Sequence, residues 1–295
     1  MSETMIKVQN LRKVYKVGGE KVVALDNVNL VIEKGEFCCI VGTSGSGKST
    51  LLNMLAGLEK PSKGKVRING QLVSKMTEKE LAVFRQNNIG FIFQSYNLMP
   101  TMTAVENVAF PLVFKGVDRK VREKRARKIL KERGLGQRMN HKPGEMSGGQ
   151  QQRVGIARAF VSKPNVIFAD EPTGNLDSAT TTLVMEMLLD ISRKNNITFV
   201  MVTHDPELAK MASRIVTLSD GKVISDMRDG VSILEDEIDR AKEDETPENT
   251  PGDEAEIKTQ AESDEERYRG GGESEEDATQ EEIISRIGRI MDSDI

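Results

Sequence analysis

One stretch of the chain decides the fold: Phe37-Cys38-Cys39-Ile40-Val41-Gly42-Thr43-Ser44-Gly45-Ser46-Gly47-Lys48-Ser49. Its first five residues are continuously apolar, which is the pattern of a strand buried on both faces of a parallel sheet. The next eight residues fit G-x-x-x-x-G-K-[ST], and a helical pattern follows from Thr50 to Leu58. A buried strand, a glycine-rich loop and a helix in this order are typical of a phosphate-binding loop in an α/β protein.

The residue types of this loop explain how it would bind phosphate. Glycines let the backbone wrap closely around phosphate groups with its N–H groups pointing inward, and the helix N-terminus adds partial positive charge. Lys48 can reach the β- and γ-phosphates, and Ser49 offers a hydroxyl to Mg²⁺. A glycine-rich turn without a ligand would not need Lys and Ser at these two positions. The candidate nucleotide-binding residues are Gly42, Thr43, Ser44, Gly45, Ser46, Gly47, Lys48, Ser49 and Thr50.

Other strands follow from the same kind of pattern. Residues 166–169 and 198–202 are continuously apolar, so we expect two more strands of a parallel sheet. Alternating apolar residues within 6–14 and 28–32 predict half-buried antiparallel strands near the N-terminus. Asp220-Gly221, between two apolar runs, predicts a hairpin. Mixed α/β architecture follows.

A pair of carboxylates comes directly after the strand predicted at 166–169. Asp170 and Glu171 would lie at the carboxyl end of that strand, where α/β sheets place ligands. Alone, such a pair is an ordinary strand exit. Beside a phosphate loop, Asp170 becomes a candidate to hold Mg²⁺, and Glu171 a candidate general base for the attacking water.

A second candidate anion site is Ser147-Gly148-Gly149-Gln150, which precedes a helical pattern. A serine hydroxyl and glycine amides at the start of a helix suit a γ-phosphate. The same residues can also be read as a helix N-cap and turn.

Taken together, these motifs and Thr203-His204-Asp205 resemble the nucleotide-binding subunits of ABC transporters over nearly all of residues 1–230. The resemblance implies a P-loop NTPase core with a mostly parallel sheet, an N-terminal antiparallel β subdomain and an inserted helical ABC-specific subdomain at about 95–165. It also implies a homodimer that hydrolyses ATP with Mg²⁺. In that family, two ATP molecules lie between head-to-tail subunits, so Ser147 to Gln150 would act on the ATP bound by the other chain.

The resemblance carries over further roles residue by residue. Gln94 matches the Q-loop glutamine, which touches Mg²⁺ and senses the membrane partner. Asn175-Leu176-Asp177 matches the D-loop, which crosses the dimer interface. His204 matches the switch histidine on the γ-phosphate, and Tyr15 matches the aromatic residue on which adenine stacks.

Two segments, 91–100 and 169–177, are similar to one branch of the family: the ATPases of macrolide exporters, lipoprotein-releasing complexes and the division-associated ATPase. This likeness implies a separate integral-membrane permease as the partner, with export or lipoprotein release as the work done. Two alternatives remain: a soluble ABC ATPase that acts on nucleic acid or ribosomes, and an importer ATPase. Only 52 residues separate Gln94 from Ser147, which leaves no room for the long coiled-coil insertion typical of soluble types.

The net charge of −4 hides an uneven distribution. Residues 1–231 carry 35 basic and 23 acidic side chains, whereas 232–295 carry 7 basic and 23 acidic ones. We expect 1–231 to form the ABC ATP-binding domain. The acidic range 232–295 is too poor in apolar residues to build a core, so we expect disorder there, with a terminal amphipathic helix at 281–291.

Composition also bears on location and partners. No apolar run approaches the ~20 residues that cross a bilayer, and the first residues lack a signal-peptide layout. We expect a cytoplasmic protein, peripheral on the inner face of the cell membrane through its permease. The basic helix predicted at 118–133 is interpreted as a solvated face, so no nucleic-acid partner is expected. Cys38 and Cys39 are interpreted as buried strand residues.

Overall fold

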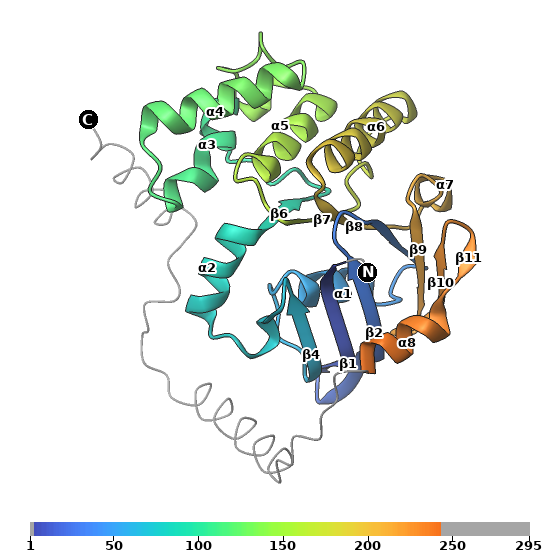
Figure 1. Ribbon diagram of the computed structural model, residues 1–295. Coiled ribbons are helices and arrows are strands. Elements are labelled where there is room, and N and C mark those ends of the chain that lie inside the picture. The colour runs from blue at the N-terminus through green and yellow to red at the C-terminus, as the bar shows by residue number, and fades with distance from the viewer. Residues whose placement is uncertain (1–2, 243–295) are drawn as a thin grey trace. The chain divides into compact units, whose positions relative to one another are not determined.

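We analysed a computed structural model of the chain, which describes residues 3–242 (Figure 1). The N-terminal residues build an antiparallel sheet with strand order β2-β1-β4-β5. The antiparallel β subdomain expected from sequence is therefore confirmed. Val31 is buried as well as Leu30 and Ile32, so residues 28–32, which we expected to be half-buried, are covered on both faces. The strands are β1 (Thr4–Val17), β2 (Glu20–Glu33), β4 (Lys63–Ile68) and β5 (Gln71–Leu72).

The second sheet has the order β11-β10-β9-β3-β8-β7-β6. Its strands from β9 to β6 are parallel, and β10 and β11 continue it in antiparallel fashion. The three continuously apolar runs form β3, β7 and β8, and Asp220-Gly221 turns β9 into β10, as expected. The strands are β3 (Phe37–Val41), β6 (Ile89–Ile92), β7 (Val166–Asp170), β8 (Thr198–Thr203), β9 (Arg214–Ser219), β10 (Lys222–Arg228) and β11 (Val231–Ser232).

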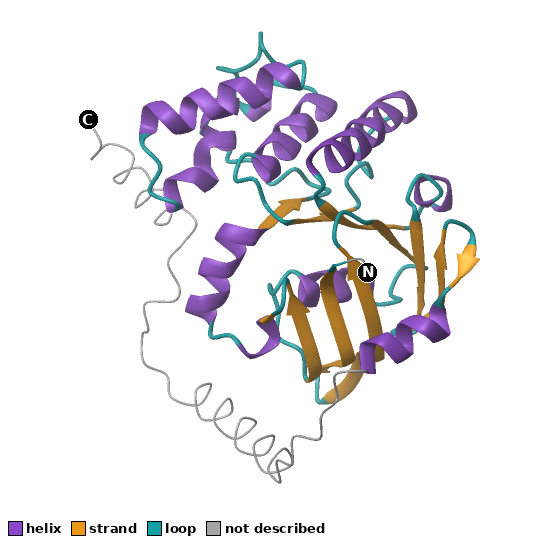
Figure 2. Cartoon of the chain, viewed as in Figure 1, coloured by secondary structure: helices purple, strands orange, loops and turns teal. Residues whose placement is uncertain are grey.

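Helices cover both faces of the parallel strands (Figures 1 and 2). Helix α1 (Lys48–Leu55) lies between the two sheets and shares one hydrophobic core with both of them. Helices α5 (Gly148–Phe160), α6 (Ser178–Asn195) and α7 (Pro206–Ala209) contribute to a second core on the other face. The two faces of the parallel strands thus pack against different helices.

A third core joins α5 to α3 (Ala104–Phe114) and α4 (Arg119–Glu132). The range 95–165, expected to be mostly helical, contains these three helices and the 3-10 turn η2 (Pro143–Glu145). In α4, Ala126 and Leu130 are buried while Lys124, Arg125, Arg127 and Lys128 are exposed, which is the solvated basic face that we expected. The remaining helical elements are η1 (Val73–Lys75) and α2 (Glu78–Asn88).

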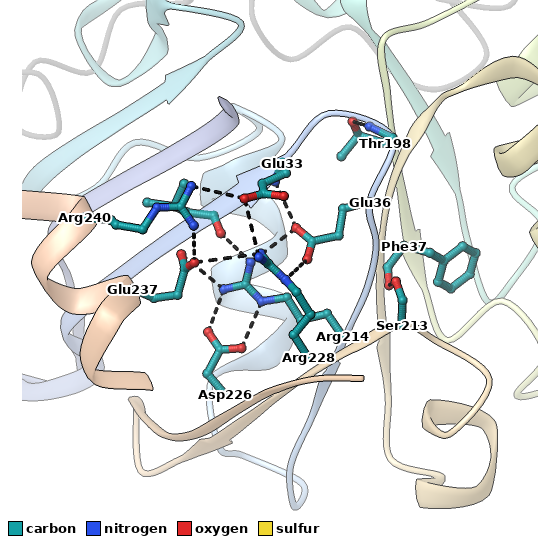
Figure 3. A network of polar contacts seen from close by, with 12 residues as sticks. Glu33, Glu36, Phe37, Thr198, Ser213, Arg214, Asp226, Arg228, Glu237 and Arg240 are labelled. Atoms are coloured by element: carbon teal, nitrogen blue, oxygen red, sulfur yellow. Dashed lines mark hydrogen bonds and ion pairs between the residues drawn. The ribbon is translucent and has the colours of Figure 1, made fainter. Parts of the chain in front are cut away.

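The first residues of the range that we expected to be a tail form β11 and the helix α8 (Leu234–Lys242). A buried ion network attaches α8 to the sheets (Figure 3). Arg214 is fully buried and donates to both carboxylate oxygens of Asp226, at 2.9 and 2.6 Å. Glu237 Oε2 of α8 lies 3.4 Å from an Arg214 guanidinium nitrogen, and Glu237 Oε1 accepts a hydrogen bond from the Arg240 guanidinium at 2.6 Å. Glu33, Glu36 and Arg228 complete the network.

Within residues 3–242, the structure contains no helix with the length and apolarity needed to cross a membrane. Cys38 and Cys39 are buried on β3, as expected. The terminal helix predicted at 281–291, and the rest of the tail from 243 onward, lie outside the described residues.

Candidate functional site

The loop between β3 and α1 holds its lysine close to the backbone. Lys48 is buried, and its ammonium donates to the carbonyls of Gly42 at 2.9 Å and Thr43 at 2.8 Å. An ammonium held beside the loop can form charge-assisted hydrogen bonds to an anion that binds there. The structure thus places a positive charge where the sequence motif predicts the phosphates.

Close backbone packing fixes the shape of the loop, and the loop offers hydrogen-bond donors for a phosphate. A Cβ on Gly42 would lie 2.2 Å from the Leu218 carbonyl, and one on Gly47 (φ +100°) 2.5 Å from the Ala24 carbonyl. Only glycine fits at these two positions. The first N–H groups of α1 have no partner within the helix, and the buried Ser46 hydroxyl has no hydrogen-bond partner. These polar groups fit a triphosphate.

Asp170, at the end of β7, lies beside the first turn of α1. The Ser49 hydroxyl donates to Asp170 Oδ1 at 3.4 Å. Burial raises the pKa of Asp170, and the charge of Glu171 adds to this rise, while Ser49 and Lys48 act in the opposite direction. Hydroxyl and carboxylate oxygens are the ligand types that Mg²⁺ prefers.

Glu171 and His204 form a pair at the ends of two neighbouring strands. His204 Nδ1 lies 2.9 Å from Glu171 Oε1. Glu171 has φ +43°, a conformation that few non-glycine residues adopt. Its amide donates to the Val202 carbonyl at 3.1 Å, so main-chain contact with β8 holds this turn. The structure brings together the two residues expected to act on the γ-phosphate and the water.

Gln94, after β6, contacts the segment that resembles the D-loop. The Asn175 side chain donates to the Gln94 carbonyl at 3.0 Å. A Cβ on Gly174 would lie 2.7 Å from Gln94 Nε2, so the glutamine side chain packs against that glycine. Residues 3–242 contain no cluster of three or more His, Cys, Asp or Glu that could hold a metal alone. Nucleotide-bound Mg²⁺ needs only one or two protein oxygens besides the phosphates.

Ser147 caps α5 with a capping box. Its hydroxyl accepts from the Gln150 amide at 3.4 Å, and its own amide donates to Gln150 Oε1 at 3.1 Å. Asp177 caps α6 by accepting from Thr180, whose backbone hydrogen bond lowers the Asp177 pKa. A Cβ on Gly149 would lie 2.7 Å from Thr180 Cγ2, so these two segments are neighbours.

The structure does not bring Ser147 to Gln150 to the phosphate loop of the same chain. Among the described residues, no hydrogen bond or ion pair joins these two segments. The reason is topological: α1 and α5 pack on opposite faces of the parallel strands (Figure 1). The two candidate half-sites therefore lie apart within one chain.

Tyr15, on β1, is held by side chains that the sequence analysis missed. Its hydroxyl donates to Glu59 at 2.8 Å, and the Lys13 ammonium lies 5.0 Å from the ring centroid. Burial and the carboxylate of Glu59 raise the Tyr15 pKa. Lys13 could have been found because residues i and i+2 of a strand share a face, whereas nothing in the sequence signals Glu59.

Comparison with known proteins gives the family. The sequence profile described as "ABC transporter" matches residues 25–174, about half of the chain. An uncharacterised ABC transporter ATP-binding protein of Methanocaldococcus jannaschii is 52% identical over 220 residues, which cover 75% of this chain and 98% of that protein. The chain belongs to the ABC transporter family.

Other relatives of this ABC protein are named for particular systems. The lipoprotein-releasing system ATP-binding protein LolD of Geobacter metallireducens is 46% identical over 76% of this chain and 99% of its own length. The macrolide export ATP-binding/permease protein MacB of a Shewanella species is 46% identical, but the aligned residues span only 35% of it.

A solved structure confirms the fold and the activity class. The ABC cassette MJ0796, in a dimeric post-hydrolysis state bound to ADP and Pi, superimposes with a TM-score of 0.72 at 45% identity, covering 76% of this chain and 99% of that one. The P-loop NTPase fold expected from sequence is thereby confirmed. The chain is an ATP-binding ABC ATPase.

Proposed function

We propose that this ABC ATPase powers a separate membrane permease of the exporter or lipoprotein-release type, at the inner face of the cell membrane. The main observation behind this proposal is the arrangement of the site. Lys48, Ser49 and Asp170 lie together, and Glu171 pairs with His204. The names of LolD and MacB support the branch. Neither name points to the alternatives, an importer ATPase or a soluble ATPase acting on nucleic acid or ribosomes.

In the proposed reaction, the amides of the phosphate loop and Lys48 bind the β- and γ-phosphates. Ser49, Asp170 and Gln94 would hold Mg²⁺, which supplies charge neutralisation at the phosphates. Glu171 orients a water for attack on the γ-phosphorus and takes its proton, while the bond from the γ-phosphorus to ADP breaks and ADP leaves. His204, held by the same carboxylate, contacts the γ-phosphate.

The second half-site comes from the partner subunit. Ser147, Gly148, Gly149 and Gln150 of one chain would close over the ATP bound by the other, with Asp177 at the interface and Tyr15 stacking on adenine. ATP binding then closes the dimer, and hydrolysis reopens it. The ATP-binding domain would extend over 1–231 with its helical part at about 95–165, followed by the acidic tail.

An apolar groove gives the permease a place to bind. The groove has a volume of about 440 Å³ and lies between α2 and the helical part of the domain. Val83 and Phe114 are exposed along it, at 54% and 63%, next to Phe91 and Phe93. Phe93 lines the groove and directly precedes Gln94 in the sequence. A permease segment bound in the groove would therefore contact the residue next to a proposed Mg²⁺ ligand.

The test is capture of the closed dimer. Tagged Glu171→Gln is trapped with ATP in native membranes and purified, and the co-purified proteins are identified by mass spectrometry. We expect a permease with a large extracytoplasmic domain, present with ATP and absent from Lys48→Ala. Phe114→Glu, combined with Glu171→Gln, should keep nucleotide binding and lose the permease. Ribosomal proteins, nucleic acid or no membrane protein would contradict the proposal.

A further inference from the structure

A cluster of polar contacts surrounds Tyr15. The Tyr15 hydroxyl donates to Glu59 Oε2 at 2.8 Å. The Lys13 ammonium lies 3.0 Å from Glu59 Oε1, donates to the Lys60 carbonyl at 2.8 Å, and sits 5.0 Å from the Tyr15 ring centroid. The tyrosine is therefore held both at its hydroxyl and at its ring.

The partner of the hydroxyl lies near the phosphate-binding element in the chain. Glu59 is in the loop that follows α1, the helix that begins at Lys48. The same loop is fastened to β1, because the Ser62 hydroxyl accepts from the Val14 amide at 3.0 Å. These contacts fix the position of the Tyr15 ring relative to the helix that presents its amides to the phosphates.

The energetics favour a preformed surface. The Lys13 side chain is only 14% exposed, so its attraction to the ring is screened less than at an open surface. A tyrosine free to change rotamer would lose conformational entropy when a base stacks on it. Here the contacts with Glu59 and Lys13 hold the Tyr15 side chain in one rotamer before the ligand binds, so this entropy loss is smaller.

We propose that Lys13 and Glu59 are positioning residues that hold Tyr15 as a preformed surface for the nucleotide base. The proposal rests on the role of Tyr15 in the proposed function. Lys13 and Glu59 act through Tyr15: within residues 3–242, their side-chain hydrogen bonds, ion pair and ring contact go to Tyr15, to each other and to the Lys60 carbonyl. They therefore set the affinity for the nucleoside part of ATP and leave the rate of the chemical step unchanged.

The test compares a ligand that has a base with one that lacks it. For the full chain, kcat and KM for ATP are measured, together with the inhibition constant of inorganic tripolyphosphate. We expect Lys13→Met and Glu59→Ala to raise KM by about three- to tenfold, with kcat and the tripolyphosphate constant unchanged. Glu59→Gln, which keeps an acceptor for the hydroxyl, should lie between Glu59→Ala and the unmodified chain. Lys16→Met, at an exposed lysine of the same strand, should change nothing.

Three results would overturn the proposal. An equal loss of tripolyphosphate affinity would mean that the variants damage the phosphate loop instead. An unchanged KM in Lys13→Met and Glu59→Ala, with a raised KM in Tyr15→Ala, would leave Tyr15 its role and remove that of its neighbours. An unchanged KM in Tyr15→Ala itself would refute the base-binding role in the proposed function as well. If Glu59→Ala fails to fold, Tyr15→Phe replaces it, because that change removes only the hydroxyl contacts.

Discussion

Glu171, the proposed general base, has an unfavourable backbone conformation. A non-glycine residue in the left-handed region costs about 1–2 kcal/mol, and Glu171 has φ +43°. The turn persists because its amide bonds to Val202 and its carbonyl accepts from Gly174 at 3.0 Å. This geometry directs the carboxylate toward His204. Strain of this kind is typical of functional sites.

The strain at Glu171 predicts that glycine is more stable than alanine at this position, the reverse of the order inside a helix. Glu171→Gly should be more stable than Glu171→Ala by about 1 kcal/mol, because glycine removes the cost of positive φ. At Glu186, exposed in the interior of α6, the order should reverse by a similar amount, because glycine weakens a helix. Urea unfolding of the four variants measures both differences. The same order at both sites would refute strain at Glu171.

Site residues that stand in local motifs could be predicted from the sequence. The residues that hold them in place from distant parts of the chain could not. Lys48 and Ser49 stand in a short motif whose chemistry can be predicted directly, and Asp170 and Glu171 become candidates because that motif is present. Glu59 is 44 positions away from Tyr15, and no local pattern links the two. Contacts of this kind depend on how β1 and the loop after α1 pack, which the sequence alone does not reveal.

At the scale of elements, the apolar pattern predicted the strands, whereas the charge composition led us to miss a helix. The strands β3, β7 and β8 were predictable because burial on both faces leaves a continuous apolar run. The acidic residues of α8 looked like part of a solvated tail. Glu237 is instead buried against Arg214 of β9 and Arg240 of its own helix. A charge count over a window ignores partners that lie outside the window.

The network at α8 predicts two different effects of truncation. A chain ending after Ile233 loses Glu237 and Arg240, which leaves Arg214 with fewer partners, and breaking buried ion pairs costs about 3–5 kcal/mol. Its free energy of unfolding should fall by this order. A chain ending after Lys242 keeps the network and should retain both stability and ATPase activity. Urea unfolding and phosphate release check the two chains. Equal stability of both would show that α8 contributes nothing to the fold.

At the scale of the whole molecule, the parallel sheet separates the two candidate half-sites. The phosphate loop leads into α1 on one face, and Ser147 caps α5 on the other. A symmetric dimer can join the half-sites of different chains, because each contact is then made twice. The solved relative is dimeric with ADP and Pi bound. In the proposed function, a single chain would therefore lack half of the residues that act on one ATP.

Mixing two inactive variants tests this arrangement. Lys48→Ala damages the phosphate loop and Ser147→Arg blocks the opposite half-site, so each homodimer has two defective sites. A mixed dimer collects both defects in one site and leaves the other intact. Equimolar mixing should therefore restore about a quarter of the unmodified activity if the sites act independently. Phosphate release from each variant alone and from the mixture measures this, with the double variant mixed with Lys48→Ala as a control that stays inactive. No recovery in the mixture would mean that both half-sites act on ATP within one chain.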